Sequence, residues 1–155
     1  YGGGLRMNEL RLLKITDIDL DRKRIHIRQG KGKKDRYVIL STLLASRFHQ
    51  YLAELKPSKY LFEGQIAGEP MGERSIQYVI NEAVQKTNIK KQVSMHTLRH
   101  SFATHLMEDG IDIHSIQHLL GHSDLRTTMV YLHVAKIKPC LAHSPLDSLY
   151  TKALV

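Results

Sequence analysis

The spacing of apolar residues predicts a mainly helical chain with one small sheet near its start. Apolar residues recur every three or four positions in residues 41–57, in residues 74–87 and again after residue 96, as on one face of an amphipathic helix. A shorter helical pattern covers residues 5–13. Residues 25–28 instead alternate between apolar and polar, and the "RYVIL" that follows has the composition of a partner strand. We therefore expect an α+β fold, mainly α with a small antiparallel β-sheet.

The two expected strands are joined by "QGKGKKD", a segment that holds two glycines and three lysines. Glycine-bearing connections between two neighbouring strands are typical of hairpins. The sequence therefore predicts a β-hairpin with a strongly basic tip.

The histidine-rich stretch "HTLRHSFATHLMEDGIDIHSIQHLLGHSDLRTTMVYLH" carries signals for three helices. The first covers about residues 97–108 and ends at Gly110. The second begins near Asp112, a residue type that caps helix amino termini well, and ends at Gly121. The third follows "HSD" and covers residues 127–133. This part of the chain is expected to form three short helices joined by tight turns.

Length and composition indicate a globular protein that consists mainly of one domain. The chain has 155 residues, of which 42% are hydrophobic and 25% are charged, and a chain of this length buries about 70% of its unfolded surface. No apolar run approaches the roughly 18 residues that a membrane-spanning helix needs. The single cysteine, Cys140, excludes an internal disulfide framework and a thiolate metal cluster, and it suits the reducing cytoplasm.

The charge balance favours an acidic partner. Lysine and arginine outnumber aspartate and glutamate by 23 to 15, which gives a net charge of +8. Nucleic acid is the commonest partner of such a chain, although a basic composition also serves solubility alone. The chain opens with "YGGGLRMNEL" rather than with a methionine, so we expect a fragment of a longer protein.

The histidines raise the question of a metal site. Seven of the ten lie between residues 96 and 133, and His96 and His100 have the spacing that lets two histidines share a metal ion on one helix face. However, the stretch has no HExxH glutamate and no nearby cluster of acids for a hard ion. We therefore expect no metal. We expect ordinary surface or core positions for five of these histidines: His100, His105, His114, His118 and His133.

Two arginines, two histidines and a tyrosine in this pattern favour a site for phosphoryl transfer. Arg6 and Arg99 can bind one phosphate from two helices, because the guanidinium is planar and keeps its charge. His96 and His122 can donate hydrogen bonds or move protons. Tyr131 alone would suggest a core residue, but beside such donors its hydroxyl can act as a nucleophile, which its free pKa of about 10 otherwise disfavours. A lysine of the basic hairpin can protonate the leaving oxygen.

Four motifs in this order resemble the catalytic domain of the tyrosine recombinases, the phage integrase family. They are "GLRMNEL", "GKGKKDR", "HTLRHSFATHL" and "LLGHSDLRTTMVYLHV", and they are similar to the Xer and integron-integrase branches in particular. The resemblance implies the tyrosine recombinase catalytic-domain fold, a supporting role for Glu9, and six catalytic residues. These six are Arg6, Lys31, His96, Arg99, His122 and the nucleophile Tyr131.

Three lysines in the hairpin compete for the family's single lysine position. Lys31 matches that position, and it lies between Gly30 and Gly32, where the backbone can approach DNA closely. The neighbouring cations are expected to contact the DNA backbone, as basic loops commonly do. These DNA-binding residues are Lys33, Lys34 and Arg36.

The resemblance further implies a site-specific DNA recombinase, or integrase, of a mobile genetic element or integron. Such enzymes cut one strand of double-stranded DNA through a 3′-phosphotyrosyl intermediate, leave a 5′-hydroxyl, and exchange strands within a homotetramer on two DNA sites. They need no cofactor and act at the nucleoid in the bacterial cytoplasm. We expect residues 1–138 to form the catalytic domain without its amino-terminal helices and core-binding domain, and residues 139–155 to form a tail that docks in trans.

Several alternatives stay open at this point. A type IB topoisomerase uses nearly the same chemistry as a monomer and would relax supercoiled DNA without sequence preference. A non-catalytic DNA-binding remnant of a mobile element would bind DNA without covalent trapping. The tail could instead pack on its own domain. The branch is open too, because "SPLDSL" is similar to the tail of integron integrases, whereas their long helical insertion before "HTLRH" is missing.

Overall fold

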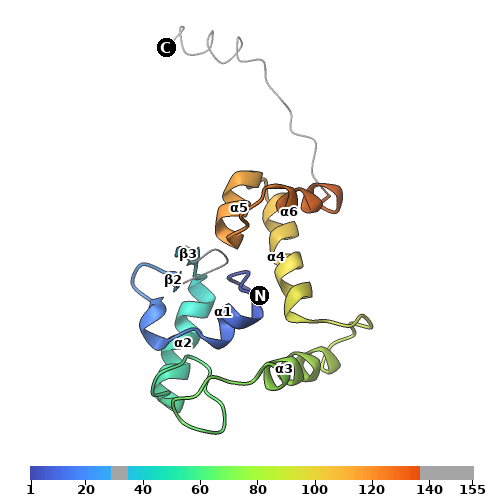
Figure 1. Cartoon of the computed structure of the whole chain (residues 1–155). Helices are drawn as coiled ribbons and strands as arrows, with labels where there is room; N and C mark the ends of the chain where they lie inside the picture. Colours follow the sequence, from blue (N-terminus) through green and yellow to red (C-terminus); the bar gives the residue numbers. More distant parts are fainter. Residues whose placement is uncertain (29–34, 137–155) are drawn as a thin grey trace, which may run out of the picture.

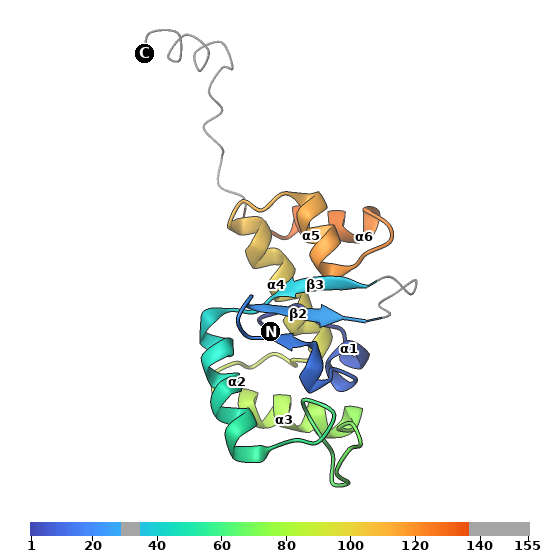
Figure 2. The same ribbon diagram turned by 90° about the vertical axis from the view of Figure 1, so that its left-hand side faces the viewer.

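The computed structural model describes residues 1–28 and 35–136 and confirms a mainly helical fold with a small antiparallel sheet. The elements run in this order: α1 (Met7–Arg11), the 3-10 helix η1 (Ile15–Asp17), β1 (Ile18–Asp19), β2 (Arg24–Ile27), β3 (Arg36–Ile39), α2 (Thr42–Leu55), α3 (Glu73–Gln85), α4 (Met95–Glu108), α5 (Ile113–Leu120), α6 (Arg126–Met129) and the 3-10 helix η2 (Val130–His133). Helices α5 and α6 lie on one side of the strands, and α2 and α3 lie on the other (Figure 1, Figure 2). No helix among these described residues is long and apolar enough to cross a membrane.

The sheet has the strand order β1–β2–β3, and both strand pairs are antiparallel. Ile25 of β2 pairs with Val38 of β3 on one side and with Ile18 of β1 on the other. The sequence pattern predicts β2 and β3 but misses β1, because a strand of two residues is too short to show an alternating pattern.

Apolar side chains form two clusters, with the first residues of the chain between them. The cluster on the sheet and α2 has these buried members: Leu5, Leu13, Ile25, Ile27, Val38, Leu40, Ala45 and Leu61. The cluster on α4, α5 and η2 has these: Ala103, Met107, Ile116, Leu120 and Tyr131. Gly4 passes between the clusters with a φ of +58°, and a Cβ there would lie 2.4 Å from the ring of Phe102. Only glycine therefore lets the chain run this close to α4.

The helix boundaries follow the capping signals, with one shift. Helix α5 begins after Asp112, as predicted, and the carboxylate accepts two backbone N–H bonds from the first turn. Helix α4 begins at Met95, about two residues before the predicted start. The cause is a capping box in which Ser94 accepts from the backbone of Thr97, while the Thr97 hydroxyl accepts from the backbone of Ser94. The third predicted helix is present as α6 followed directly by η2.

Helix α3 buries less of its apolar face than its pattern predicts. The spacing predicts that Ile76, Val79, Ile80 and Ala83 face inward. Ile76 is buried, but Val79 is 53% exposed and Ala83 is exposed as well. The pattern thus identifies the helix correctly and overestimates how much of it the rest of the described chain covers.

Candidate active site

Five of the six predicted catalytic residues line one cleft of about 450 Å³. They come from four separate segments of the chain and are Arg6, His96, Arg99, His122 and Tyr131. The sixth, Lys31, lies outside the described residues, as do Lys33 and Lys34. The fold therefore brings together side chains that the sequence analysis could connect only through motif order.

Local structure explains how these side chains reach the cleft. Arg6 precedes α1 in an extended conformation. His96 and Arg99 are three residues apart in the first turns of α4, so they share one face of that helix. His122 follows the left-handed glycine that ends α5. Tyr131 lies on η2 and packs into the second apolar cluster.

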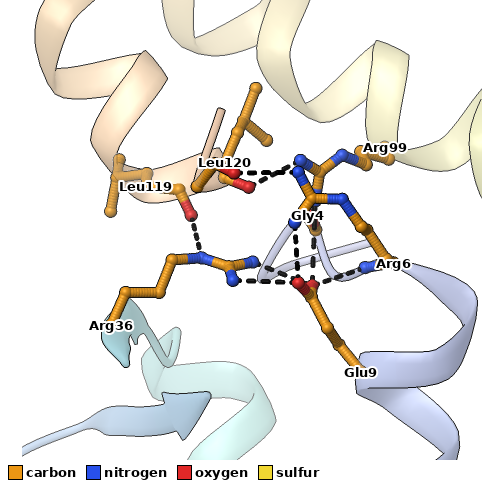
Figure 3. Close-up of polar contacts among 8 residues, drawn as sticks. Gly4, Arg6, Glu9, Arg36, Arg99, Leu119 and Leu120 are labelled. Atoms are coloured by element: carbon orange, nitrogen blue, oxygen red, sulfur yellow. Dashed lines mark hydrogen bonds and ion pairs between the residues drawn. The ribbon is translucent and has the colours of Figure 1, made fainter. Parts of the chain in front are cut away.

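Glu9 binds two arginines through one carboxylate (Figure 3). Its Oε1 accepts from Arg6 at 2.8 Å and from Arg36 at 2.9 Å, and its Oε2 accepts from Arg36 at 2.8 Å. The backbone N–H of Arg6 also donates to Oε2, and Arg99 Nη1 lies 3.8 Å from that oxygen. Burial alone would raise the pKa of Glu9, but the hydrogen bonds from Arg36 and Arg6 outweigh it and lower the pKa to about 2. The carboxylate therefore stays charged and fixes the guanidinium groups around it.

The carboxyl end of α5 binds Arg6, Arg36 and Arg99. Carbonyl groups at a helix end lack partners within the helix and carry partial negative charge. Three successive carbonyls of this end each accept a hydrogen bond from a different arginine (Figure 3). The pairs are Arg36 with Leu119 at 2.9 Å, Arg99 with Leu120 at 2.6 Å, and Arg6 with Gly121 at 2.9 Å. The helix end thus sets the spacing between the guanidinium groups.

Arg99 carries its charge although only 6% of it is exposed. Burial and the charge of Arg6 lower its pKa to about 10, while the charge of Glu9 opposes this shift. A pKa of about 10 still leaves the guanidinium protonated at neutral pH. Arg99 also donates to the carbonyl of Gly4 at 2.6 Å. Three arginines around one glutamate leave a surplus of fixed positive charge beside the cleft, which suits a phosphate.

Arg36 lies in a different place from the one that the sequence analysis expects. We expect it to contact DNA, but it is 6% exposed, and its guanidinium is bonded to Glu9 and to the carbonyl of Leu119. The reason is strand geometry, because Arg36 and Val38 share the buried side of β3. The alternation in "RYVIL" already places Arg36 and Val38 on the same side of the strand. In this arrangement Arg36 links Glu9 to the carboxyl end of α5.

Tyr131 contacts two histidine rings at the edge of the cleft. Its ring centroid lies 5.3 Å from that of His100 and 6.5 Å from that of His122. The residue is 4% exposed. Burial raises the pKa of its hydroxyl, although the charges of Arg99 and Arg6 act in the opposite direction. The tyrosine therefore holds its proton in this state, and a base must accept that proton before the oxygen can attack.

Thr128 contacts His122 from the buried side. Its Oγ1 lies 2.9 Å from Nδ1 of His122, and the threonine is fully buried. A hydroxyl that donates to Nδ1 leaves the ring proton on Nε2, where it can be donated to a ligand in the cleft. No sequence motif points to Thr128, although its position one turn before Tyr131 places it beside the site.

His100 lines the same cleft, whereas the sequence analysis expects an ordinary histidine there. Its Nε2 lies 2.6 Å from Nε2 of His96. The spacing of four residues on one helix is a sequence signal for this contact, although the same spacing also suits a metal-binding pair. Across residues 1–28 and 35–136, no three histidines, cysteines or acids gather in a way that could hold a metal ion.

The known proteins that this chain resembles include tyrosine recombinases. The phage integrase family pattern matches residues 1–138. The chain is 44% identical over 137 residues to the tyrosine recombinase XerA of Thermococcus kodakarensis, which covers 86% of this chain and 48% of that protein. It is 37% identical over 159 residues to the tyrosine recombinase XerC of Bacillus licheniformis, which covers 94% and 51%. The chain thus spans about half the length of the curated relatives it matches.

Solved structures agree with the sequence comparison. The crystal structure of a XerA recombinase matches with a TM-score of 0.76 at 36% identity, over 97% of this chain and 54% of that one. The XerH site-specific recombinase bound to difH substrate matches with a TM-score of 0.74 at 27% identity, over 99% and 43%. Since the family pattern covers most of the residues and the fold agrees, the chain belongs to the phage integrase family and has the fold of a tyrosine recombinase catalytic domain.

Proposed function

We propose that this chain is the catalytic domain of a site-specific DNA recombinase that cuts and rejoins DNA through a 3′-phosphotyrosyl intermediate. The observation that carries the proposal is the cleft in which a tyrosine, three histidines and two arginines meet. This set supplies a nucleophile, proton carriers and fixed positive charge. Together these are what phosphoryl transfer without a metal requires.

The first step of the proposed reaction is attack by Tyr131 on a DNA phosphodiester. The phenolic oxygen forms a bond to phosphorus, and the bond from phosphorus to the 5′ oxygen breaks. The tyrosine proton passes to a base, and the departing 5′ oxygen takes up a proton from an acid. One phosphate ester replaces another, so the reverse reaction can rejoin a strand without an external energy source.

The other residues take roles that follow from their chemistry and surroundings. Arg6 and Arg99 stabilise the charge that develops on the non-bridging oxygens, and His122 donates to the same phosphate from Nε2. His96 accepts the proton of the nucleophile. Glu9 orients the arginines. Lys31, which matches the family's hairpin lysine, is the proposed acid for the 5′ oxygen.

Double-stranded DNA is the proposed partner. The net charge of +8 favours a polyanion, and the XerH recombinase that this chain resembles is bound to its difH substrate. The resemblance also supports a homotetramer on two DNA sites, action at the nucleoid of a bacterial cytoplasm, and a tail at residues 139–155 that docks in trans. Lys33 and Lys34 are proposed to contact the DNA backbone.

Membership of the phage integrase family disfavours the two alternative functions. A type IB topoisomerase would share the chemistry, but the relatives of this chain are recombinases and integrases. A non-catalytic remnant would not need to keep the catalytic side chains, and five of them line one cleft here.

Covalent trapping tests the proposal. Protein containing this chain is incubated with a pool of nicked DNA duplexes of random sequence, and covalent complexes are isolated under denaturing conditions. The trapped DNA is sequenced, and the attached peptide is identified by mass spectrometry. We expect a 3′-phosphate ester on Tyr131, enrichment of related DNA sequences, and no adduct with Tyr131→Phe.

Three results would contradict the proposal. An adduct on Tyr37 instead of Tyr131 would identify a different nucleophile. DNA binding without any adduct would support the non-catalytic remnant. Relaxation of supercoiled plasmid without enrichment of any sequence would support a topoisomerase.

A further inference from the structure

His96 and His100 form a contact that the reaction above does not explain. They lie four residues apart on α4, and their Nε2 atoms are 2.6 Å apart. Their ring centroids are 4.1 Å apart with the planes at 90°. At this distance the two nitrogens must share one hydrogen, because two N–H groups or two lone pairs facing each other would repel.

The surroundings indicate which nitrogen accepts. His100 is half-buried, and burial, followed by the charges of His96 and Arg99, lowers the pKa of His100. His96 is exposed toward the cleft. His100 therefore stays neutral, and its Nε2 accepts the hydrogen bond from Nε2 of His96. The pair then holds no more than one positive charge.

The pair lies beside the proposed nucleophile. The ring of His100 packs against that of Tyr131, with centroids 5.3 Å apart. The other titratable or charged groups facing this part of the cleft from described elements are Arg6 before α1, Arg99 on α4 and His122 after α5. The arginines cannot accept a proton, and Nδ1 of His122 is bonded to Thr128. This arrangement favours the histidine pair as the acceptor of the tyrosine proton.

We propose that His96 and His100 act as one proton-accepting unit, in which His100 is a positioning residue that holds His96 in place and shares the proton released by Tyr131. The inference rests on the proposed function. As the tyrosine oxygen bonds to phosphorus, its proton moves to Nδ1 of His96, and the Nε2–H of the resulting imidazolium donates to the neutral His100. The same proton returns to the tyrosine when the strand is rejoined.

Two substitutions at His100 separate its nitrogen from its ring. His100→Phe keeps an aromatic ring against Tyr131 but removes the acceptor, whereas His100→Gln keeps an oxygen that can accept from His96. His118→Phe is the matched control, because His118 is an exposed histidine on α5 that does not line the cleft. All variants would be compared with the unmodified protein on the nicked duplex selected by covalent trapping.

The pH profile of single-turnover cleavage is the first measurement. His100→Phe should cleave about tenfold more slowly. The rising limb of its pH profile should also move to lower pH, because the hydrogen bond that stabilises the protonated pair is lost. His100→Gln should recover most of the rate, and His118→Phe should behave like the unmodified protein. An unchanged rate, or a slower rate with an unchanged pH profile, would overturn the proposal and indicate packing only.

A substrate with sulfur in the 5′-bridging position separates the two proton transfers. Sulfur leaves without being protonated, so a residue that serves only the leaving group becomes dispensable on this substrate. His100→Phe should stay about tenfold slow here. Recovery to the rate of the unmodified protein would show that the pair serves the leaving group, which would overturn the assignment to Tyr131.

Histidine ring nitrogen shifts from NMR test the pair without DNA. We expect an unprotonated Nε2 on His100 and a protonated Nε2 on His96, and we expect the His96 signals to change in His100→Phe but not in His118→Phe. If His96 and His100 show the same tautomer mixture as the exposed His118, the pair does not exist, whatever the cleavage rates are. If the pair exists but the unmodified protein traps no DNA, the proposed function itself fails.

Discussion

At the scale of single residues, Glu9 shows how one carboxylate organises a site for an anion. Three guanidinium groups close together repel one another, and a negative charge between them reduces that repulsion. The glutamate side chain is 8% exposed and bonds directly to Arg6 and Arg36. Its negative charge offsets only part of the positive charge, so the cleft keeps its attraction for phosphate.

Glu9→Gln should lower the free energy of unfolding by about 3 kcal/mol at neutral pH. The pKa of Glu9 is lowered to about 2 in the folded chain, from 4.5. Its stabilising effect is therefore complete above about pH 4.5 and is lost as the pH falls toward 2. Denaturant unfolding of both proteins at a series of pH values measures the difference, which should narrow over that interval.

Acid unfolding of the unmodified protein alone would not isolate Glu9, because the pKa of Glu63 is also lowered to about 2. Burial would raise it, but hydrogen bonds from Ser58 and Lys59 outweigh that effect. The difference between Glu9→Gln and the unmodified protein removes the contribution of Glu63. A difference that stays constant from pH 4.5 to pH 2 would show that the charge of Glu9 is not what stabilises the fold.

Thr128→Val should slow DNA cleavage about tenfold through His122. Valine has nearly the shape of threonine but lacks the hydroxyl, so Nδ1 of His122 loses its buried partner and the proton is no longer held on Nε2. Thr128→Ser keeps the hydroxyl and should retain most of the activity. Single-turnover cleavage measures the effect, and thermal unfolding controls for stability. Equal losses in both variants would mean that the methyl group, rather than the hydroxyl, is what matters.

Residue identities in the site were predictable where a motif names them, and not where the role depends on packing. Arg6, His96, Arg99 and Tyr131 stand in motifs, and the cleft brings them together. His100 contacts Tyr131 because the second cluster places η2 against α4. Such contacts join segments far apart in the chain, and single-sequence patterns do not report them.

At the scale of elements, α5 is the helix on which the site is built. Its amino end is fixed by Asp112, and its carboxyl end supplies three carbonyls to three arginines. The helix ends at Gly121 with a φ of +63°, and a Cβ there would lie 3.0 Å from a guanidinium nitrogen of Arg36. Glycine therefore suits the left-handed backbone conformation, and a Cβ here would press against Arg36.

Gly121→Ala should reduce cleavage about tenfold to a hundredfold, because the added methyl displaces Arg36 and through it Glu9. Gly110→Ala is a matched control, since Gly110 also has a positive φ, of +84°, but a Cβ there would meet nothing within 4 Å. Both variants should lose about 1–2 kcal/mol of stability from the left-handed backbone. Cleavage that falls equally in both variants would show that backbone strain alone explains the loss.

Elements were predictable to the extent that their signals are local. Residues close together in the sequence specify the caps at Asp112 and Gly121 and the helical spacing of α2. The structure agrees with these signals. The apolar pattern places the start of α4 too late, because the capping box of Ser94 lies before that pattern begins. The strand β1 is visible only through its pairing with β2, which is a tertiary contact.

At the scale of the whole molecule, the site lies where two apolar clusters meet. Arg36 comes from the strand side, Arg99 from the side of α4, and both bond around Glu9 and the end of α5. Relative movement of the two clusters would therefore change the distances between the guanidinium groups. The same junction that holds the fold together also sets the geometry offered to a phosphate.

Exposed apolar side chains near the end of the described chain are relevant to the proposed assembly. Four apolar residues of α6, η2 and the position after them are exposed by 38% to 64%: Met129, Val130, Leu132 and Val134. The tail that follows carries Leu146, Leu149, Leu154 and Val155, which lie outside the described residues. An apolar surface and an apolar tail are the two halves of a contact that can form within one chain or between neighbours.

Deleting residues 141–155 should weaken the joining of two DNA sites at least about tenfold while changing single-site binding little, because docking in trans acts only between subunits. Gel-shift assays with one and two sites measure the two effects. Val134→Asp should act similarly by placing a charge among the exposed apolar side chains.

Mixing the two variants decides whether the tail docks in cis or in trans. In trans, the tail of the Val134→Asp chain can still reach the intact surface of the shortened chain, so joining should partly recover. In cis neither chain has both halves of the contact, and a mixture as weak as each variant alone would show that the tail packs on its own domain.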